Sequence, residues 1–188
     1  METYVALLRG INVGKKRIKM ADLVMIFESL GLTAVQTYIQ SGNVIFNSEL
    51  DEETLTELLS CRISLHYGFD VPVILRSSDQ FRNALSNCPF TKDEIDNAIA
   101  LGAVGRYEAV YVSFLPNEIT EQDFSKLTKY IEKDNQCAFY GREVYLLLSE
   151  SIRTAKVAIN LKRIGAEGTI RNFNTIKKIG DMLENIEE

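Results

Sequence analysis

The two halves of this 188-residue chain show the same succession of sequence patterns, and this repeat most restricts the folds open to it. Short apolar runs typical of strands alternate with apolar residues at helical spacing. In the first half, these patterns lie at Tyr4–Arg9, Met20–Leu30, Val35–Ile39, Val44–Asn47, Asp51–Tyr67, Val71–Arg76 and Ser78–Leu85. In the second half, they lie at Ala109–Leu115, Thr120–Ile131, Cys137–Tyr140, Glu143–Ser149, Ala155–Ile164, Thr169–Arg171 and Ile176–Ile186.

Each half therefore reads strand, helix, two strands joined by a hairpin, helix, strand and helix. Gly42 and Gly141 supply the conformational freedom that the hairpin turns need. We predict an α+β chain of two tandem ferredoxin-like (βαββαβ) subdomains, each followed by an extra helix. The first spans residues 1–88, a connector spans 89–108, and the second, with the C-terminal helix, spans 109–188. The repeat indicates an internal duplication in the order of elements, since few residues are identical between the halves.

Composition excludes several classes of protein. The three cysteines, Cys61, Cys88 and Cys137, have no CxxC spacing, and His66 is the single histidine, which argues against a disulfide framework or a metal site. No cofactor motif is present. The sequence shows no signal peptide and no apolar run long enough to span a membrane, so we expect a cytoplasmic protein.

The net charge of −5 conceals a segregated pattern. Residues 1–48 carry a net charge of +2, residues 49–150 carry −9, residues 151–180 carry +6 and residues 181–188 carry −4. Two basic stretches in an acidic chain favour a local anion site over general nucleic-acid coating, which requires a basic domain. The alternative is that these stretches are solvated helix faces.

Two loops rich in Gly, Asn, Gln, Ser and basic residues follow neighbouring strands. In a βαββαβ unit the third strand lies between the first two, so the end of the first strand and the hairpin share one edge of the sheet. This edge brings together the candidate ligand-binding residues Arg9, Gly10, Asn12, Gly14, Lys15, Gln40, Ser41, Gly42 and Asn43. The second helix returns to the same edge, so we expect His66, Tyr67 and Asp70 to form a third border.

These residue types suit an oxyanion. Glycines let main-chain N–H groups approach a ligand, Asn and Gln offer donors and acceptors, and Arg9 can hold a carboxylate or phosphate with two hydrogen bonds. The alternative is that Asn12, Gln40 and Asn43 only satisfy main-chain groups of their own loops. The motif GINVGKK lacks the spacing of a phosphate loop, and Ser41 does not lie in a nucleophile elbow.

The second basic stretch ends in TIRNFNTIKKI. Asn172 or Asn174 can cap the last helix, whose N-terminal dipole would attract an anion beside Arg171. A capped and solvated helix is the alternative.

Five segments of this chain resemble a family of bacterial proteins known only as domain of unknown function 1697. They are LLRGINVG at Leu7–Gly14, Met20 at the start of the helix, TYIQSGNVIF at Thr37–Phe46, NCPF at Asn87–Phe90, and TIRNFNTIKKI at Thr169–Ile179. The resemblance implies two ferredoxin-like subdomains and carries no activity, substrate or catalytic residue. It also implies that the RGIN, QSGN and TIRNFNT segments are parts of one common structural arrangement.

The leading hypothesis is a cytosolic protein that binds a small anionic or phosphorylated ligand between the RGINVGK and QSGN loops. The sequence assigns no reaction; if the groove is catalytic, Arg9 would stabilise developing negative charge. The rival is a protein-interaction or oligomerisation module without catalytic activity, and single-stranded nucleic-acid binding is third.

Overall fold

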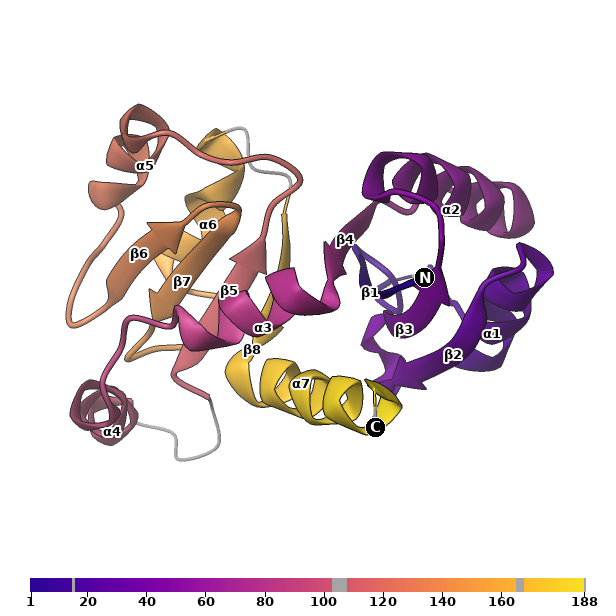
Figure 1. Ribbon diagram of the computed structural model, residues 1–188. Helices are drawn as coiled ribbons and strands as arrows, with labels where there is room; N and C mark the ends of the chain where they lie inside the picture. Colours follow the sequence, from indigo (N-terminus) through magenta and orange to yellow (C-terminus); the bar gives the residue numbers. More distant parts are fainter. Residues whose placement is uncertain (15, 103–107, 165–167, 188) are drawn as a thin grey trace. The chain divides into compact units, whose positions relative to one another are not determined.

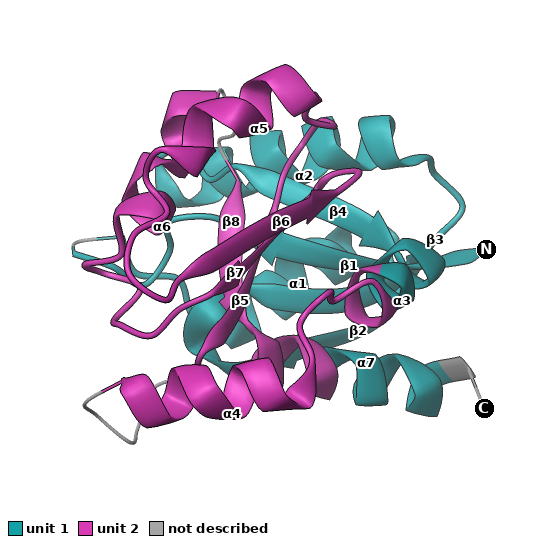
Figure 2. Ribbon diagram, turned by 90° about the vertical axis from the view of Figure 1, so that its left-hand side faces the viewer, with its two compact units in different colours: residues 1–83, 179–188 teal, residues 84–178 magenta. Residues whose placement is uncertain are grey.

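A computed structural model describes residues 1–14, 16–102, 108–164 and 168–187 (Figure 1). The chain forms two compact units, one of residues 1–83 and 179–188 and the other of residues 84–178 (Figure 2). The fold is α+β, with one four-stranded antiparallel sheet in each unit. This division differs from the predicted subdomains, because it places residues 179–188 with the first half of the chain.

The first unit is built on a sheet with strand order β2-β3-β1-β4. Its elements are β1 (Glu2–Leu8), α1 (Met20–Ser29), β2 (Thr33–Tyr38), the 3₁₀ turn η1 (Ile39–Ser41), β3 (Asn43–Ser48), α2 (Glu52–Tyr67) and β4 (Val73–Ser77). As predicted, the third strand lies between the first two. Leu7 of β1 pairs with Asn43 of β3, so the end of β1 and the β2–β3 turn share one edge of the sheet.

Helices α1 and α2 cover one face of this sheet (Figure 1). Alternate residues of β1, among them Ala6 and Leu8, face a core that α1 supplies with Leu23 and Phe27. The Phe27 ring meets Phe46 of β3 edge to face, with 5.1 Å between ring centroids. This core fixes where α1 begins.

The β2–β3 hairpin, predicted at Gly42, contains a short 3₁₀ turn. Strand β2 ends at Tyr38, and the 3₁₀ turn Ile39–Ser41 precedes Gly42, which adopts a left-handed φ of 71°. A Cβ atom at Gly42 would lie 2.5 Å from Ile11 Cδ1, so glycine is required here by space as well as by φ.

The second unit repeats this arrangement with strand order β6-β7-β5-β8. Its elements are α4 (Lys92–Leu101), β5 (Val110–Phe114), α5 (Glu121–Thr128), β6 (Gln136–Tyr140), β7 (Glu143–Leu147), α6 (Lys156–Asn160), the 3₁₀ helix η2 (Leu161–Ile164) and β8 (Thr169–Asn172). Helices α3 (Ser78–Ser86) and α7 (Phe173–Glu187) each belong partly to both units. Thr120 accepts a hydrogen bond from the Asp123 N–H and caps the start of α5. The Gly141-Arg142 turn between β6 and β7 is also as predicted, with φ of 56° at Gly141.

Part of the predicted connector is helical. Helix α4 lies within residues 89–108, for which the sequence analysis predicts no helix. A reciprocal capping box begins it: the Glu94 N–H donates to Thr91 Oγ1, and the Thr91 N–H donates to the Glu94 carboxylate. The Thr-x-x-Glu spacing was the signal for this helix.

The structure reveals one residue-level trace of the repeat. Arg76 in β4 pairs with Val5 of the first strand of its unit, and Arg171 in β8 pairs with Val112 of the corresponding strand. Both arginines are buried, and each guanidinium donates to the carbonyl of the residue before it. The two edge strands therefore share register as well as position.

Candidate functional site

The predicted loops meet at one edge of the first sheet. The Leu8 N–H donates to the Gly42 carbonyl at 2.8 Å, which places the exit of β1 beside the β2–β3 turn. After Leu8, the chain passes through Gly10, Asn12 and Gly14, all with positive φ, before α1 begins at Met20. Glycine and asparagine tolerate this region best, so the loop residues suit the backbone path.

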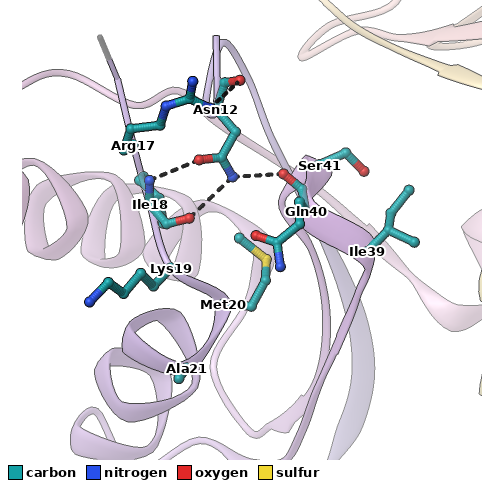
Figure 3. A pocket seen from close by; sticks show the side chains of 9 residues that line it. All are labelled: Asn12, Arg17, Ile18, Lys19, Met20, Ala21, Ile39, Gln40 and Ser41. Carbon is teal, nitrogen blue, oxygen red and sulfur yellow. Dashed lines mark hydrogen bonds between the residues drawn. The ribbon is translucent and has the colours of Figure 1, made fainter.

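Asn12 joins this loop to the turn (Figure 3). Its side-chain nitrogen donates to the Gln40 carbonyl at 2.7 Å and to the Ile18 carbonyl at 3.1 Å, and its oxygen accepts from the Ile18 N–H at 3.0 Å. For Asn12, the alternative interpretation is therefore the better one: these contacts satisfy main-chain groups.

Asn43 plays a similar part in the turn. Its side chain is fully buried, and its amide donates to the Tyr38 carbonyl at 3.2 Å and to Ser41 Oγ at 2.7 Å. These bonds hold the turn that carries Gln40, which gives Asn43 a structural role at this edge.

A groove of about 800 Å³ lies between the loop and the turn. We call it the α1 groove, and its lining residues are Asn12, Arg17, Ile18, Lys19, Met20, Ala21, Ile39, Gln40 and Ser41 (Figure 3). Of the predicted binding residues, Asn12, Gln40 and Ser41 line it. Arg9, Gly10, Gly14, Gly42 and Asn43 are outside its lining, and Lys15 lies outside the described residues.

Cationic side chains and a helix start form one side of the α1 groove. Arg17 and Lys19 are exposed, and Arg17 Nη1 lies 3.4 Å from the Asn12 carbonyl. Lys19 is the N-cap residue of α1, and its side chain makes no capping hydrogen bond. Met20 and Ala21, the first two residues of the helix, both line the groove. The first turn of an uncapped helix presents N–H groups and a positive partial charge.

Gln40 stands on the other side of the groove. Its side chain points toward Met20, whereas the Ile39 side chain points away from it (Figure 3). Ile39 is about half exposed at 49% and has a φ of 49°, a conformation that is costly for a β-branched residue. The turn therefore holds Gln40 toward the start of α1 despite local strain at Ile39.

The end of α2 borders the loop, as predicted. The Tyr67 hydroxyl donates to the Asp22 carboxylate at 3.3 Å, and burial together with this carboxylate raises the pKa of Tyr67 to about 12. Lys16 Nζ donates to the Asp70 carbonyl at 3.1 Å and lies 5.2 Å from the centroid of the Phe69 ring. His66 is exposed and packs edge to face on Tyr67.

At the second predicted anion site, beside Arg171 at the start of α7, the structure favours the alternative of a capped helix. The Asn172 side chain accepts from the Thr175 N–H at 2.8 Å and caps α7. The Asn174 N–H donates to the Glu108 carboxylate at 3.2 Å, so a carboxylate of the chain already occupies this helix start. Arg171 donates to Thr169 Oγ1 and to the Ile170 carbonyl, and its burial lowers its pKa to about 10. Arg171 and Asn174 thus have partners within their own unit.

The sequence model of one protein family, described as protein of unknown function (DUF1697), matches residues 1–145 of this chain. The chain belongs to the DUF1697 family. The solved structure of a conserved bacterial protein, SP0830 from Streptococcus pneumoniae, is similar to this chain, with 30% sequence identity. The match covers 98% of this chain and 99% of that one, with a TM-score of 0.73. No curated protein matches this sequence.

The matched part of this DUF1697 chain contains the whole α1 groove, whereas Arg171, Asn172 and Asn174 follow it. Sequence reasoning missed Arg17, Lys19, Met20 and Ala21 as groove residues. Their signal was the absence of Ser, Thr, Asp or Asn at the N-cap position of a clearly periodic helix.

None of the described helices is both long and apolar enough to cross a membrane. Among the described residues, no three His, Cys, Asp or Glu side chains are grouped as metal ligands.

Proposed function

We propose that this DUF1697 protein binds a small anionic, phosphorylated ligand in the α1 groove. One observation carries the proposal: α1 starts in the groove without a side-chain cap, next to the exposed cations Arg17 and Lys19. A phosphate there would accept hydrogen bonds from the N–H groups of the first turn. The helix dipole contributes about 0.3–1 kcal/mol in such a setting, and charge-assisted hydrogen bonds contribute about 1.5–3 kcal/mol each.

The groove is preorganised for such a ligand. Because Asn12 ties the loop to the Gln40 carbonyl, the two sides of the groove are held together before anything binds. A rigid site loses less conformational entropy on binding. Gln40 and Ser41 offer neutral donors and acceptors that would orient the rest of the ligand.

Two further assignments accompany the proposal. We infer that each unit is a ferredoxin-like fold, supported by the antiparallel strand orders β2-β3-β1-β4 and β6-β7-β5-β8. We also infer a cytoplasmic location, supported by the free thiols of Cys61, Cys88 and Cys137.

Thermal unfolding with inorganic phosphate, pyrophosphate and sugar phosphates tests the proposal. A ligand at about one hundred times its Kd stabilises the folded state by about 2.7 kcal/mol, which raises the Tm of a chain of this size by roughly 5–10 °C. The double variant Arg17→Gln/Lys19→Gln should lose this rise while keeping the Tm of the free protein.

The matched control removes two cations elsewhere. Arg62 and Arg153 are exposed and line no part of the α1 groove, so Arg62→Gln/Arg153→Gln should keep the rise in Tm. Loss of the rise in both double variants would indicate a general charge effect, and no rise with any phosphate compound would overturn the proposal.

A further inference from the structure

The second unit provides an internal reference for the edge of the first sheet that carries the α1 groove. Asn43 begins β3 and pairs with Leu7 of β1, and Glu143 begins β7 and pairs with Phe114 of β5. The two edges therefore correspond residue by residue. Any feature that only the first unit has at this edge is an addition to the shared arrangement.

Both connections that flank the α1 groove are longer than their counterparts. Four residues, 39–42, join β2 to β3, whereas two residues, 141–142, join β6 to β7. Eleven residues, 9–19, join β1 to α1, whereas six residues, 115–120, join β5 to α5. The longer turn contains the 3₁₀ turn that carries Gln40.

The extra residues are not needed to form the sheet. The second unit has the corresponding strand order, β6-β7-β5-β8, with the shorter connections. Its helix α5 also begins with a cap, since Thr120 accepts a hydrogen bond from the Asp123 N–H, whereas Lys19 leaves α1 without a side-chain cap. The additions in the first unit are thus concentrated around the α1 groove.

The α1 groove is larger than a phosphate group, and its charged side chains lie on one side. Its volume of about 800 Å³ is within the range of roughly 300–1,000 Å³ that holds drug-sized ligands. Arg17 and Lys19 lie beside the start of α1, whereas the turn presents the neutral side chains of Gln40 and Ser41 (Figure 3). An anion at the helix start therefore leaves the Gln40 side for an uncharged part of the ligand.

Gln40 and Met20 suit a flat group with a polar edge. The Gln40 side chain points toward Met20, and within the described part of the chain its amide has no hydrogen-bond partner (Figure 3). This amide offers a donor and an acceptor side by side, which matches the edge of a nucleobase. The thioether of Met20 is flexible and polarizable and packs well against aromatic rings.

We propose that the ligand is a nucleoside 5′-monophosphate and that Gln40 selects its base. This inference rests on the proposed function, because it takes the phosphate site at the start of α1 as given. The phosphate lies against the first turn of α1, the base packs on Met20, and the polar edge of the base exchanges two hydrogen bonds with the Gln40 amide. Asn12 holds the Gln40 main chain in place through the 2.7 Å bond to its carbonyl.

Isothermal titration calorimetry of the full chain tests this inference with inorganic phosphate, ribose 5-phosphate and the four common ribonucleoside 5′-monophosphates. We expect at least one nucleotide to bind about tenfold more tightly than ribose 5-phosphate, because the base adds hydrogen bonds and a ring contact. Gln40→Leu should remove most of this advantage. Binding of ribose 5-phosphate should be unchanged in that variant, since Asn12 bonds the main chain of Gln40 and not its side chain.

The matched control is Gln36→Leu. Gln36 is exposed on β2 and does not line the α1 groove, so this variant should keep the preference for the nucleotide. Thermal melting of both variants checks that they fold. An unchanged preference in Gln40→Leu, or the same loss in both variants, would overturn the selection by Gln40.

The ligand series separates this inference from the proposed function. If ribose 5-phosphate binds as tightly as every nucleotide, the base selection is wrong and the phosphate site stands. If no phosphate compound binds, both are wrong. If the nucleoside alone binds as tightly as its nucleotide, the Gln40 contact is supported and the phosphate site is contradicted.

Discussion

The side-chain nitrogen of Asn12 lies 2.7 Å from the main-chain oxygen of Gln40, and this hydrogen bond joins two loops that are 28 residues apart in the sequence. The same side chain also bonds both main-chain groups of Ile18. One asparagine thus positions the turn, the loop and the approach to α1.

Two substitutions of Asn12 should separate the contribution of its hydrogen bonds to stability from that of its left-handed backbone conformation. Asn12→Gly keeps a residue that tolerates the φ of 54° but loses the hydrogen bonds, which should cost about 1–3 kcal/mol. Asn12→Ala loses the same bonds and adds left-handed strain, about 1 kcal/mol more. Urea unfolding measures both, and an alanine variant as stable as the glycine variant would argue against a left-handed Asn12.

Gly42 should be less replaceable than Gly68, although both have a positive φ. Gly42→Ala adds a Cβ atom 2.5 Å from Ile11 and 2.8 Å from Leu8, so steric overlap adds to the strain and the total cost should be about 2–4 kcal/mol. Gly68→Ala meets no atom within 4 Å and should cost about 1 kcal/mol. Equal losses in urea unfolding would mean that the turn does not pack against Ile11.

Glu150 should contribute to the acid sensitivity of the fold. The Lys133 ammonium, followed by the Asn135 amide, holds the pKa of Glu150 below its ordinary value. The unfolded chain therefore binds this proton more readily, so the contribution is present above about pH 4.5 and is lost as pH falls through the lowered pKa. Glu150→Gln should show a smaller loss of stability between about pH 5 and pH 3 than the wild type. Glu118→Gln, at an exposed carboxylate, serves as the control, and identical acid unfolding of Glu150→Gln and wild type would refute this role.

Only one of the three cysteines should react quickly in the folded protein. Cys61 is exposed on α2, whereas burial raises the pKa of Cys137 to about 12 and also raises the pKa of Cys88. Burial therefore keeps Cys137 in its thiol form at pH 8, and the thiolate is the reactive form. Ellman's reagent should show one fast thiol, which Cys61→Ser removes. Two or three fast thiols would mean that the second unit opens readily.

Local patterns predicted much of the fold. Leu23 and Phe27 at helical spacing located α1, Gly42 and Gly141 located the two turns, and the Thr120 cap located α5. Each of these signals acts between residues close in sequence. Helix α4 was missed because few apolar residues mark its buried face, with Ala98 alone fully buried, although its Thr91–Glu94 capping box was visible.

The site was predicted only in outline for a related reason. The predicted strand order correctly placed Asn12 and Gln40 at one edge of the sheet. The sequence does not show, however, which groups a side chain hydrogen-bonds. Asn12 bonds main-chain groups, and Asn43 bonds the Tyr38 carbonyl and the Ser41 hydroxyl. Arg17 and Lys19 line the groove although they were not among the predicted binding residues, because the sequence does not show which loop side chains border a groove.

A phosphate titration followed by amide resonances tests the central claim most directly. With millimolar inorganic phosphate, the account predicts saturable shifts concentrated at the amides of Lys19, Met20, Ala21 and Gln40, and their loss in Arg17→Gln/Lys19→Gln. Shifts spread over the other basic surfaces, or none at these four amides, would contradict an anion site in the α1 groove.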